Sequence, residues 1–503
     1  MEDTGEDFDN LIWDQNDEEW ERVQPELRQR STIHLVEALA SEKFGCPSTW
    51  VSPMNIGGFN IVYRLQVESY ASDVIVRRPI PCYAQFPEEK TLIEAATASY
   101  IEKHTQIPVA SVLFHGKSSG LGQYMIIKHV QHQHSMSTAL NATNHDTDQT
   151  FILDPNISED FLEDLYKKVA NCLLELSQHT FCRVGSLVET KAGSYTVATR
   201  PITRDMNDML QLAGIPPSIL PPKDKTFGTA DEYYTELANL HLAQLVFQHN
   251  DLVSSENDCR NKYVARQIFR KLAREGKLSS FGFREDHWSA QSKTNSSIVS
   301  PEPPNTDSFR LYCDDLRAGN ILLDKNDNIA AIIDWEFTYA APSQFSLDPP
   351  WWLVLDAPEM WDKGIDDWVQ FYEPRMRIWL SAVQRAEAEA TVDSTKRSLE
   401  VPLSKYMRES WETGRFWLSY AARKSWAFDA LYWKFLDEKF FGVRPSDISK
   451  DELWKTRLYL LSDVEKAAMD VFVDRKMEET KDRKLVDWDP EEAKGRLAEV
   501  LFD

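Results

Sequence analysis

The sequence predicts an α+β protein in which a small strand-rich part precedes a large, mainly helical part. Three short apolar runs alternate with turns between residues 50 and 78, which favours an antiparallel sheet. After residue 158, long stretches with helical spacing of apolar residues dominate. Within that helical part, the stretch 309–336 differs, because its short apolar runs end in polar side chains. We therefore expect the chemistry of the protein to be concentrated at 309–336.

Composition restricts the class of protein and of ligand. The chain has 503 residues, of which 42% are apolar and 11% aromatic, so it can bury a large core. Its net charge of −24 argues against binding to nucleic acid or to an anionic membrane surface. It favours a small-molecule partner that is neutral or cationic. The six cysteines form no C-x-x-C pair, which fits a reduced, cytoplasmic protein.

The N-terminal residues 1–24 are predicted to be an acidic tail. Residues 1–21 contain ten acidic residues and no Lys or Arg, and such a charge run is typically solvated. The apolar residues at 11–13 and Trp20 leave a short docking segment as the alternative. Residues 25–43 have the apolar spacing of one helix.

A small antiparallel sheet is expected next. Its predicted strands are Trp50–Met54, Ile61–Val67 and Val74–Arg78. The turn between the first two contains Gly57, Gly58 and Phe59, and glycine lets backbone N–H groups approach phosphate oxygens closely. An ordinary hairpin turn is the alternative. The third strand brings a cation, Arg77, to its end.

A helix over residues 89–104 and a strand over residues 121–130 follow the predicted sheet. Glu94 lies on this helix and is either a partner for a buried cation or an exposed helix glutamate. The strand ends in Lys128, His129 and Val130, where we expect the link between the two parts. His129, His132, His134 and His145 follow no metal-ligand spacing, so a polar loop is favoured over a metal site.

The stretch 309–336 reads as strand, turn, strand, turn, strand. The expected strands are Phe309–Cys313, Ile321–Leu323 and Ile329–Ile333. Asp315 and Asn320 lie five residues apart in the first turn, and Asp334 ends the third run. Because a β-hairpin returns on itself, Asn320 and Asp334 can face the same site.

These three polar side chains are the set that phosphoryl transfer requires. One carboxylate orients the attacking hydroxyl and accepts its proton, while an amide oxygen and a second carboxylate hold Mg²⁺ against the phosphates. A surface hairpin with Asp and Asn as turn residues is the alternative. A surface hairpin accounts for any one of these residues, but it does not account for all three in this order along the stretch.

The ordered stretch resembles the catalytic core of the protein-kinase-like superfamily. Its D-x-x-x-x-N, hairpin and I-D-W-E sequence is most similar to the aminoglycoside phosphotransferase branch, including its fungal members. The V-R-R-P at 76–79 and the F-C-R-V-G-S-L at 181–187 add to this resemblance, which covers roughly residues 47–355. It implies a two-lobed protein-kinase-like fold, with a small mixed N-lobe at 25–130 and a large helical C-lobe at 131–503.

The resemblance also implies an activity and site residues. The activity is ATP-dependent transfer of the γ-phosphoryl group to a hydroxyl of a small molecule, with Mg²⁺ as the metal. Asp315 would be the catalytic residue, and Asn320 and Asp334 would hold Mg²⁺. The implied nucleotide-binding residues are Gly57, Gly58 and Phe59 over the phosphates, Arg77 held by Glu94, and the backbone of Lys128, His129 and Val130 at adenine.

Two departures from the family pattern, at Arg77 and Cys313, keep a second class open. Arg77 takes the place of a lysine, and Cys313 that of the histidine in H-x-D, where we expect neutral packing. Asp314 is an additional carboxylate, expected to be solvated or paired with a base. A nucleotide-binding pseudokinase or interaction scaffold is therefore the alternative. A protein kinase is disfavoured because no A-P-E follows Asp334.

Overall fold

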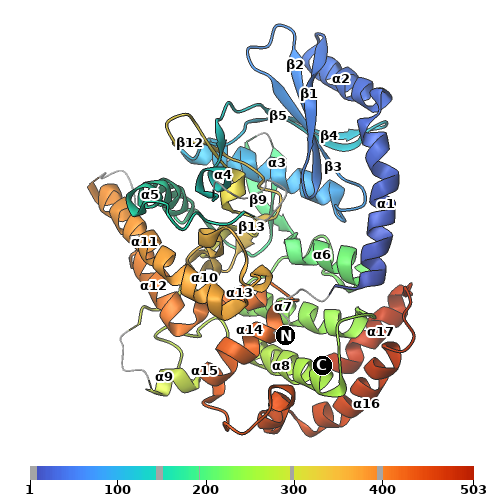
Figure 1. The fold of residues 1–503 in the computed structure, drawn as a ribbon, viewed down its shortest axis with the longest axis vertical. Coiled ribbons are helices and arrows are strands. Elements are labelled where there is room, and N and C mark those ends of the chain that lie inside the picture. The colour runs from blue at the N-terminus through green and yellow to red at the C-terminus, as the bar shows by residue number, and fades with distance from the viewer. Residues whose placement is uncertain (1–7, 143–150, 192, 295–298, 393–399, 503) are drawn as a thin grey trace.

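A computed structural model describes residues 8–142, 151–191, 193–294, 299–392 and 400–502. The chain forms a sheet lobe, which contains strands β1–β5, above a larger helical lobe (Figure 1). No helix in these described ranges is both long and apolar enough to cross a membrane.

The sheet lobe is a five-stranded antiparallel sheet in the order β1-β2-β3-β5-β4. Its strands are β1 (Ser48–Ile56), β2 (Asn60–Val67), β3 (Val74–Pro79), β4 (Val112–Ser118) and β5 (Gly122–Lys128). Side chains alternate between the two faces of a strand, so Val74 and Val76 enter the core of this lobe. Ile75 and Arg77 consequently point to the opposite face, where they line a cavity.

Three helices accompany this sheet, namely α1 (Asn10–Arg28), α2 (Arg30–Phe44) and α3 (Pro87–His104). The prediction of a solvated tail is wrong from residue 10 onward, and residues 1–7 lie outside the described part. Asp9 caps α1 by accepting from the N–H groups of Leu11 and Ile12. Val23 and Leu27 of α1 are buried, so the docking alternative describes this segment. The single helix expected at 25–43 is interrupted at Gln29, whose backbone is extended.

The helical lobe is built around long amphipathic helices. Those of eight or more residues are α5 (Glu159–Leu176), α6 (Arg204–Ala213), α7 (Ala230–Phe247), α8 (Glu256–Arg274), α11 (Ile365–Val392), α12 (Leu403–Thr413), α13 (Arg415–Ala422), α16 (Asp463–Glu479) and α17 (Pro490–Leu501). The shorter ones are α4 (Met136–Leu140), α9 (Ala290–Thr294), α10 (Ser343–Ser346), α14 (Phe428–Leu431) and α15 (Asp437–Phe441). Ser158 caps α5, as its position before two acids predicted.

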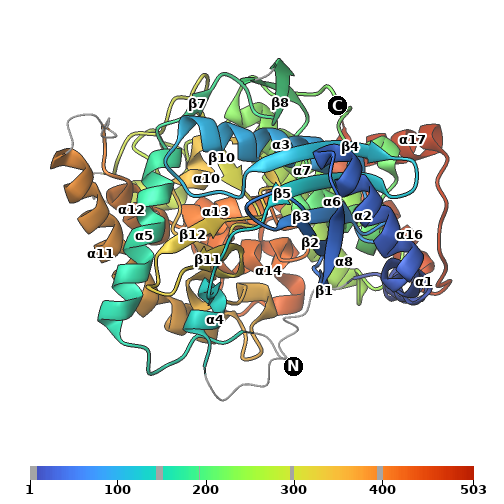
Figure 2. The same cartoon turned by 90° about the horizontal axis from the view of Figure 1, so that it is seen from above.

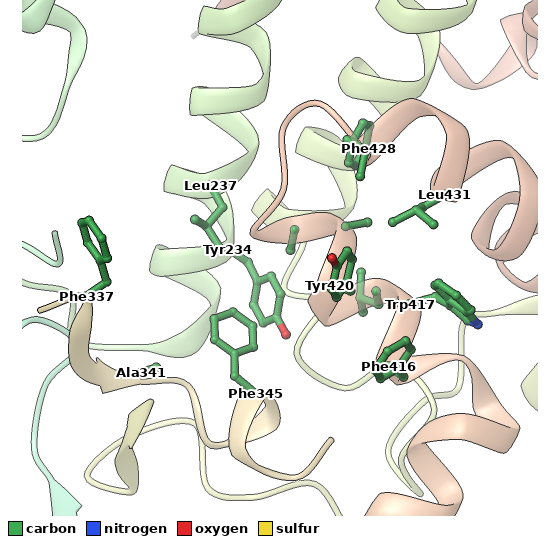
Figure 3. Packing of buried hydrophobic residues seen from close by; sticks show 14 of the residues in the cluster. Tyr234, Leu237, Phe337, Ala341, Phe345, Phe416, Trp417, Tyr420, Phe428 and Leu431 are labelled. Atoms are coloured by element: carbon green, nitrogen blue, oxygen red, sulfur yellow. The ribbon is translucent and has the colours of Figure 1, made fainter. Parts of the chain in front are cut away.

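Aromatic side chains fill much of the core of the helical lobe (Figure 3). Tyr234 of α7 meets Phe345 of α10 edge to face, with ring centroids 5.7 Å apart. Trp417 and Trp433 are buried in the same core, and Trp411 and Trp426 pack against it. These tryptophans therefore belong to the core rather than to a substrate cleft.

The stretch 309–336 forms its strands where the sequence predicted them. These are β10 (Phe309–Cys313), β11 (Ile321–Leu323) and β12 (Ile329–Ile332), followed by β13 (Thr338–Ala341). Strand β10 pairs with β13 and with β7 (Thr180–Phe181), and β11 pairs with β12 and with β6 (His134–Ser135). Seen from above, β11 and β12 lie between α5 and the sheet lobe (Figure 2). A separate hairpin joins β8 (Ser186–Lys191) to β9 (Ser194–Thr199).

The segment 136–156, although rich in polar residues, is partly built into the core. Met136 and Leu140 of α4 are buried, and Leu153 is buried as well. Apolar side chains at these positions fill space beside the hairpins, whereas residues 143–150 lie outside the described part.

Candidate active site

A cavity of about 590 Å³ lies between the sheet lobe and the hairpins of the stretch 309–336. It collects most of the side chains that the sequence singled out. Its lining includes Gly57, Gly58, Phe59, Arg77, Lys128, His129, Val130, Asp315 and Asp334. Glu94 and Asn320 lie behind this lining and contact Arg77 and Asp315.

Asp315 lies in the loop after β10, with its side chain almost fully buried. Asn320 holds it in place by donating Nδ2–H to the Asp315 carbonyl oxygen over 2.8 Å and to Oδ2 over 3.2 Å. Arg204 and Arg317 each place a guanidinium nitrogen 3.5 Å from Oδ1. Burial raises the pKa of the Asp315 carboxyl, while Arg317 and Arg204 oppose that rise.

Asp334 follows β12, and its backbone φ of 68° lies in the left-handed region. A non-glycine residue in that region is strained and is often held so by a functional site. Arg77 donates Nη2–H to Asp334 Oδ1 over 2.6 Å. Burial opposes ionisation of Asp334, but the charges of Arg77 and Lys90 outweigh it and lower the pKa of the carboxyl.

The predicted pair of Arg77 and Glu94 is present. Arg77 Nη1 donates to Glu94 Oε1, and both side chains are buried, so Glu94 is not an exposed helix glutamate. Burial raises the pKa of Glu94 to about 7, with Arg77 acting to lower it and two neighbouring carboxylates acting to raise it. The pKa of the Arg77 guanidinium is raised because Asp334 and Glu94 outweigh its desolvation.

The segment expected to contact adenine is partly occupied by its own backbone hydrogen bonds. The N–H groups of Lys128 and His129 donate to the carbonyl oxygens of Ser111 and Asp73 over 2.9 and 3.0 Å. The Val130 carbonyl lies 2.9 Å from Nδ1 of His132. The N–H groups of Lys128 and His129 therefore face protein acceptors, while all three residues line the cavity.

Sequence reasoning missed a buried contact between the glycine turn, α3 and the residue two after Asp334. Lys90 Nζ donates to the Glu336 carboxylate and, over 3.1 Å, to Oδ1 of Asn60. The position of Lys90 four residues before Glu94 on one helix face was the available signal. For Arg204, 111 residues before Asp315 in the chain, the sequence carried no signal.

Three carboxylates lie close enough together to hold a metal ion, but Arg77 and Lys90 already contact them. Oxygens of Glu94, Asp334 and Glu336 lie within 4.8 Å of one another. Hard oxygen donors of this kind suit Mg²⁺. Asn320, the other expected ligand, points its Nδ2–H at Asp315, so its amide oxygen is directed elsewhere. Within the described part of the chain, His129, His132 and His134 form no such group, and His145 lies outside that part.

The two departures next to Asp315 have structural partners. Cys313 is buried with Sγ 3.8 Å from the Asp334 carbonyl oxygen, and burial raises the pKa of its thiol well above the usual value. It therefore packs as a neutral side chain. Asp314 is also buried, and its carboxylate lies 3.5 Å from the guanidinium of Arg423. Pairing with a basic side chain was one of the two arrangements expected for it.

Comparisons with known proteins give matches among solved structures alone. No family model and no curated protein matches the chain. A thermostable mutant of aminoglycoside phosphotransferase APH(4)-Ia, in complex with AMP-PNP and hygromycin B, is 14% identical, with a TM-score of 0.36 and coverage of 78% of this chain and 98% of that one. The GDP complex of wild-type aminoglycoside 2'-phosphotransferase-IIIa is 13% identical, with a TM-score of 0.33 and coverage of 78% and 99%.

A protein from Haemophilus somnus 129PT, described as a fructosamine-3-kinase, is 11% identical, with a TM-score of 0.34 and coverage of 75% and 96%. These three similar structures are thus two aminoglycoside phosphotransferases and one fructosamine kinase by their descriptions. The kinase-like, two-lobed α+β description of this fold rests on the chain's own elements. These are a five-stranded antiparallel sheet with α3, followed by the hairpins of the stretch 309–336 inside a helical lobe.

Proposed function

We propose that the chain is an ATP-dependent phosphotransferase that moves the γ-phosphoryl group to a hydroxyl of a small molecule. One observation carries this proposal. Asp315, Asp334 and Arg77 line one cavity, which the glycine turn bounds on one side and the segment 128–130 on another. An enzyme that aligns a hydroxyl with a nucleotide phosphate needs these groups to converge.

Each group has a task in this proposal. Asp315 accepts the proton of the acceptor hydroxyl, and Asn320 keeps its carboxylate oriented. Arg77 binds phosphate oxygens with a planar fork, which a lysine lacks. Asp334 would hold Mg²⁺ together with Asn320, whose amide would have to turn its oxygen toward the metal, and Mg²⁺ would supply charge neutralisation at the phosphates.

The acceptor is proposed to be a small molecule with a hydroxyl group, neutral or moderately cationic. The net charge of the chain favours such a ligand over an anion. Arg204 and Arg317 beside Asp315 disfavour a strongly cationic one, since both side chains are partly exposed in the cavity.

A nucleotide-binding pseudokinase or scaffold is the second candidate, and the contact of Arg77 with Asp334 favours it. That contact occupies one oxygen of the proposed metal ligand, so metal binding requires the guanidinium to share or release it. A protein that binds nucleotide without transferring phosphate does not need that exchange.

Two measurements decide between the candidates. Mg·ATP that binds the folded chain raises its melting temperature by an amount set by ligand concentration over Kd. Purified protein with Mg·ATP is then screened against a panel of hydroxyl-containing metabolites for ADP release. Release with one acceptor supports the enzyme, and binding with no acceptor-dependent release supports the pseudokinase. No thermal shift at millimolar Mg·ATP contradicts both.

A further inference from the structure

Three buried polar side chains form a closed hydrogen-bonded triangle beside the candidate site. They are Asn60 at the end of the glycine turn, Lys90 on α3 and Glu336 after the third catalytic strand. Lys90 donates to Glu336 and to Asn60, and Asn60 Nδ2 donates to Glu336 Oε2 over 2.7 Å. Their exposed fractions are 7%, 1% and 1%. Segments far apart in the chain are thereby joined at one point.

An aromatic contact repeats this connection. The rings of Phe59 and Phe337, the chain neighbours of Asn60 and Glu336, meet edge to face with centroids 5.1 Å apart. Lys90 Nζ lies 5.7 Å from the first centroid and 6.0 Å from the second, within cation–π range. The turn is therefore attached to the catalytic stretch by both polar and apolar groups.

The backbone of the turn is closed by its own hydrogen bonds. Gly57 N–H donates to the Asn60 carbonyl oxygen over 2.8 Å, and Ile80 N–H donates to that of Phe59 over 2.9 Å. Contacts that hold Asn60 in place therefore also restrict Gly57, which is hydrogen-bonded to it, and Gly58, which lies between the two in the chain. Those two glycines line the cavity.

A buried ion pair gives little net stability, because desolvation offsets most of the attraction. Its value lies in geometry, since Lys90, Glu336 and Asn60 satisfy one another only in one relative position. We propose that these three side chains act as a turn latch, which holds the glycine turn against the catalytic stretch before any nucleotide arrives. They are positioning residues, acting through the backbone of Gly57 and Gly58 and through Asp334.

The latch has a consequence that rests on the proposed function. If the turn covers nucleotide phosphates, a turn that is already ordered loses less conformational freedom on binding. The latch then raises affinity for Mg·ATP and leaves the chemical step at saturation nearly unchanged.

The first test needs no nucleotide. Asn60→Ala removes the two hydrogen bonds that the Asn60 side chain makes with Lys90 and Glu336, and it keeps the ion pair between Lys90 and Glu336. Hydrogen exchange of the peptide covering residues 56–61 should become at least about tenfold faster in Asn60→Ala, because local opening no longer breaks two hydrogen bonds. Gln66→Ala, an exposed amide on the same strand, is the matched control and should exchange like the parent.

A second set of variants tests the ion pair. Lys90→Met leaves the Glu336 carboxylate buried beside Asp334, so it should lower the melting temperature more than the double change Lys90→Met with Glu336→Gln. Turn exchange should follow the same order. Additive losses, or turn exchange equal to that of the parent in Asn60→Ala, would overturn the latch.

The binding measurement separates the latch from the proposed function. Asn60→Ala should weaken the Kd for Mg·ATP by about tenfold while kcat at saturation changes less than about threefold. A merely structural role would lower the melting temperature and leave turn exchange below the transition unchanged. If the parent binds no Mg·ATP, the proposed function fails, and the exchange data still decide the latch.

Discussion

The guanidinium of Arg77 binds Asp334 across the cavity, with Nη2 2.6 Å from Oδ1, while its other terminal nitrogen binds Glu94. Strand β3, helix α3 and the end of β12 therefore share one cation. Glu336 lies 3.6 Å from the same nitrogen, so three carboxylates depend on Arg77.

Replacing Arg77 should reveal that dependence. Arg77→Met leaves buried carboxylates without their cation and should lower the free energy of unfolding by about 3–5 kcal/mol. The double variant with Glu94→Gln should recover part of this loss, because one carboxylate has been removed. Urea unfolding of the parent, of Arg77→Met, of Glu94→Gln and of the double variant measures the coupling. Arg64→Met, which breaks a more exposed pair with Asp73, is the control and should cost at most about 1 kcal/mol.

The same variants test the role of the pair in nucleotide binding. If Glu94 orients Arg77, Arg77→Met and Glu94→Gln should each weaken the binding of Mg·ATP. The double variant should then bind Mg·ATP about as weakly as the single variant with the larger loss of affinity. Losses that add fully would show that the two residues act independently.

Asp315 and Asp334 should differ in what they affect. Asp315→Asn keeps shape but removes the proton acceptor, so turnover should fall by about 10²–10⁴ with little change in Mg·ATP affinity. Asp334→Asn removes a metal-binding charge and should weaken Mg·ATP binding itself. Calorimetric titration and steady-state rates with the acceptor found by screening measure both. Equal turnover in Asp315→Asn and the parent would remove Asp315 from the mechanism.

The buried thiol of Cys313 should be protected from alkylation in the folded protein. Its pKa is raised by burial, so little thiolate is present, whereas Cys182 is exposed. With iodoacetamide at pH 8, peptide mapping should find Cys182 modified first and Cys313 modified only after urea is added. Modification of both at the same rate in the native state would contradict the packing role given to Cys313.

Asp205 at the start of α6 should make stability depend on pH. Burial raises its pKa to about 6, against the ordinary 3.8, although Ser425 donates two hydrogen bonds to it. The folded state then holds a proton that the unfolded state has lost between about pH 4 and 6. The free energy of unfolding therefore falls with rising pH in this window, by about 2–3 kcal/mol from this group.

Asp205→Asn removes the titrating group and should flatten that part of the curve. Relative to the parent, the variant should be more stable at pH 7 than at pH 4.5, measured by urea unfolding at both values. A difference between the two proteins that does not change with pH would contradict the raised pKa.

Local patterns in the sequence predicted the catalytic strands well. Strands β10, β11 and β12 follow from short apolar runs and turns, and the return of one hairpin brings Asn320 near Asp334: Ile333 N–H donates to the Asn320 carbonyl oxygen over 2.9 Å. The pairing of Arg77 with Glu94 was accessible because family resemblance supplied the partner.

Contacts between distant segments could not be predicted in this way. Lys90 and Glu336 are 246 residues apart, and although each lies near a residue that the sequence singled out, no local pattern joins the two. Helix α1 was not predicted, because its many acidic residues indicated a solvated tail. Only two of its residues, Val23 and Leu27, are buried, so the apolar signal in the sequence is weak. The limits placed on the lobes at residues 24 and 130 stay a prediction.

Helix α1 attaches to both lobes. At its start, Asn250 of the helical lobe donates to the Asp9 carboxylate over 2.8 Å, and near its end the Leu27 carbonyl oxygen accepts from Tyr63 of the sheet over 2.9 Å. The polypeptide segment after β5 is a second connection between the lobes. The contacts of Arg77 with Asp334 and of Lys90 with Glu336 join the lobes at further points. A force that pulls on residue 9 is therefore passed through α1 to the sheet as well as to the helical lobe, so the first residues of the chain are mechanically coupled to the strands that line the cavity.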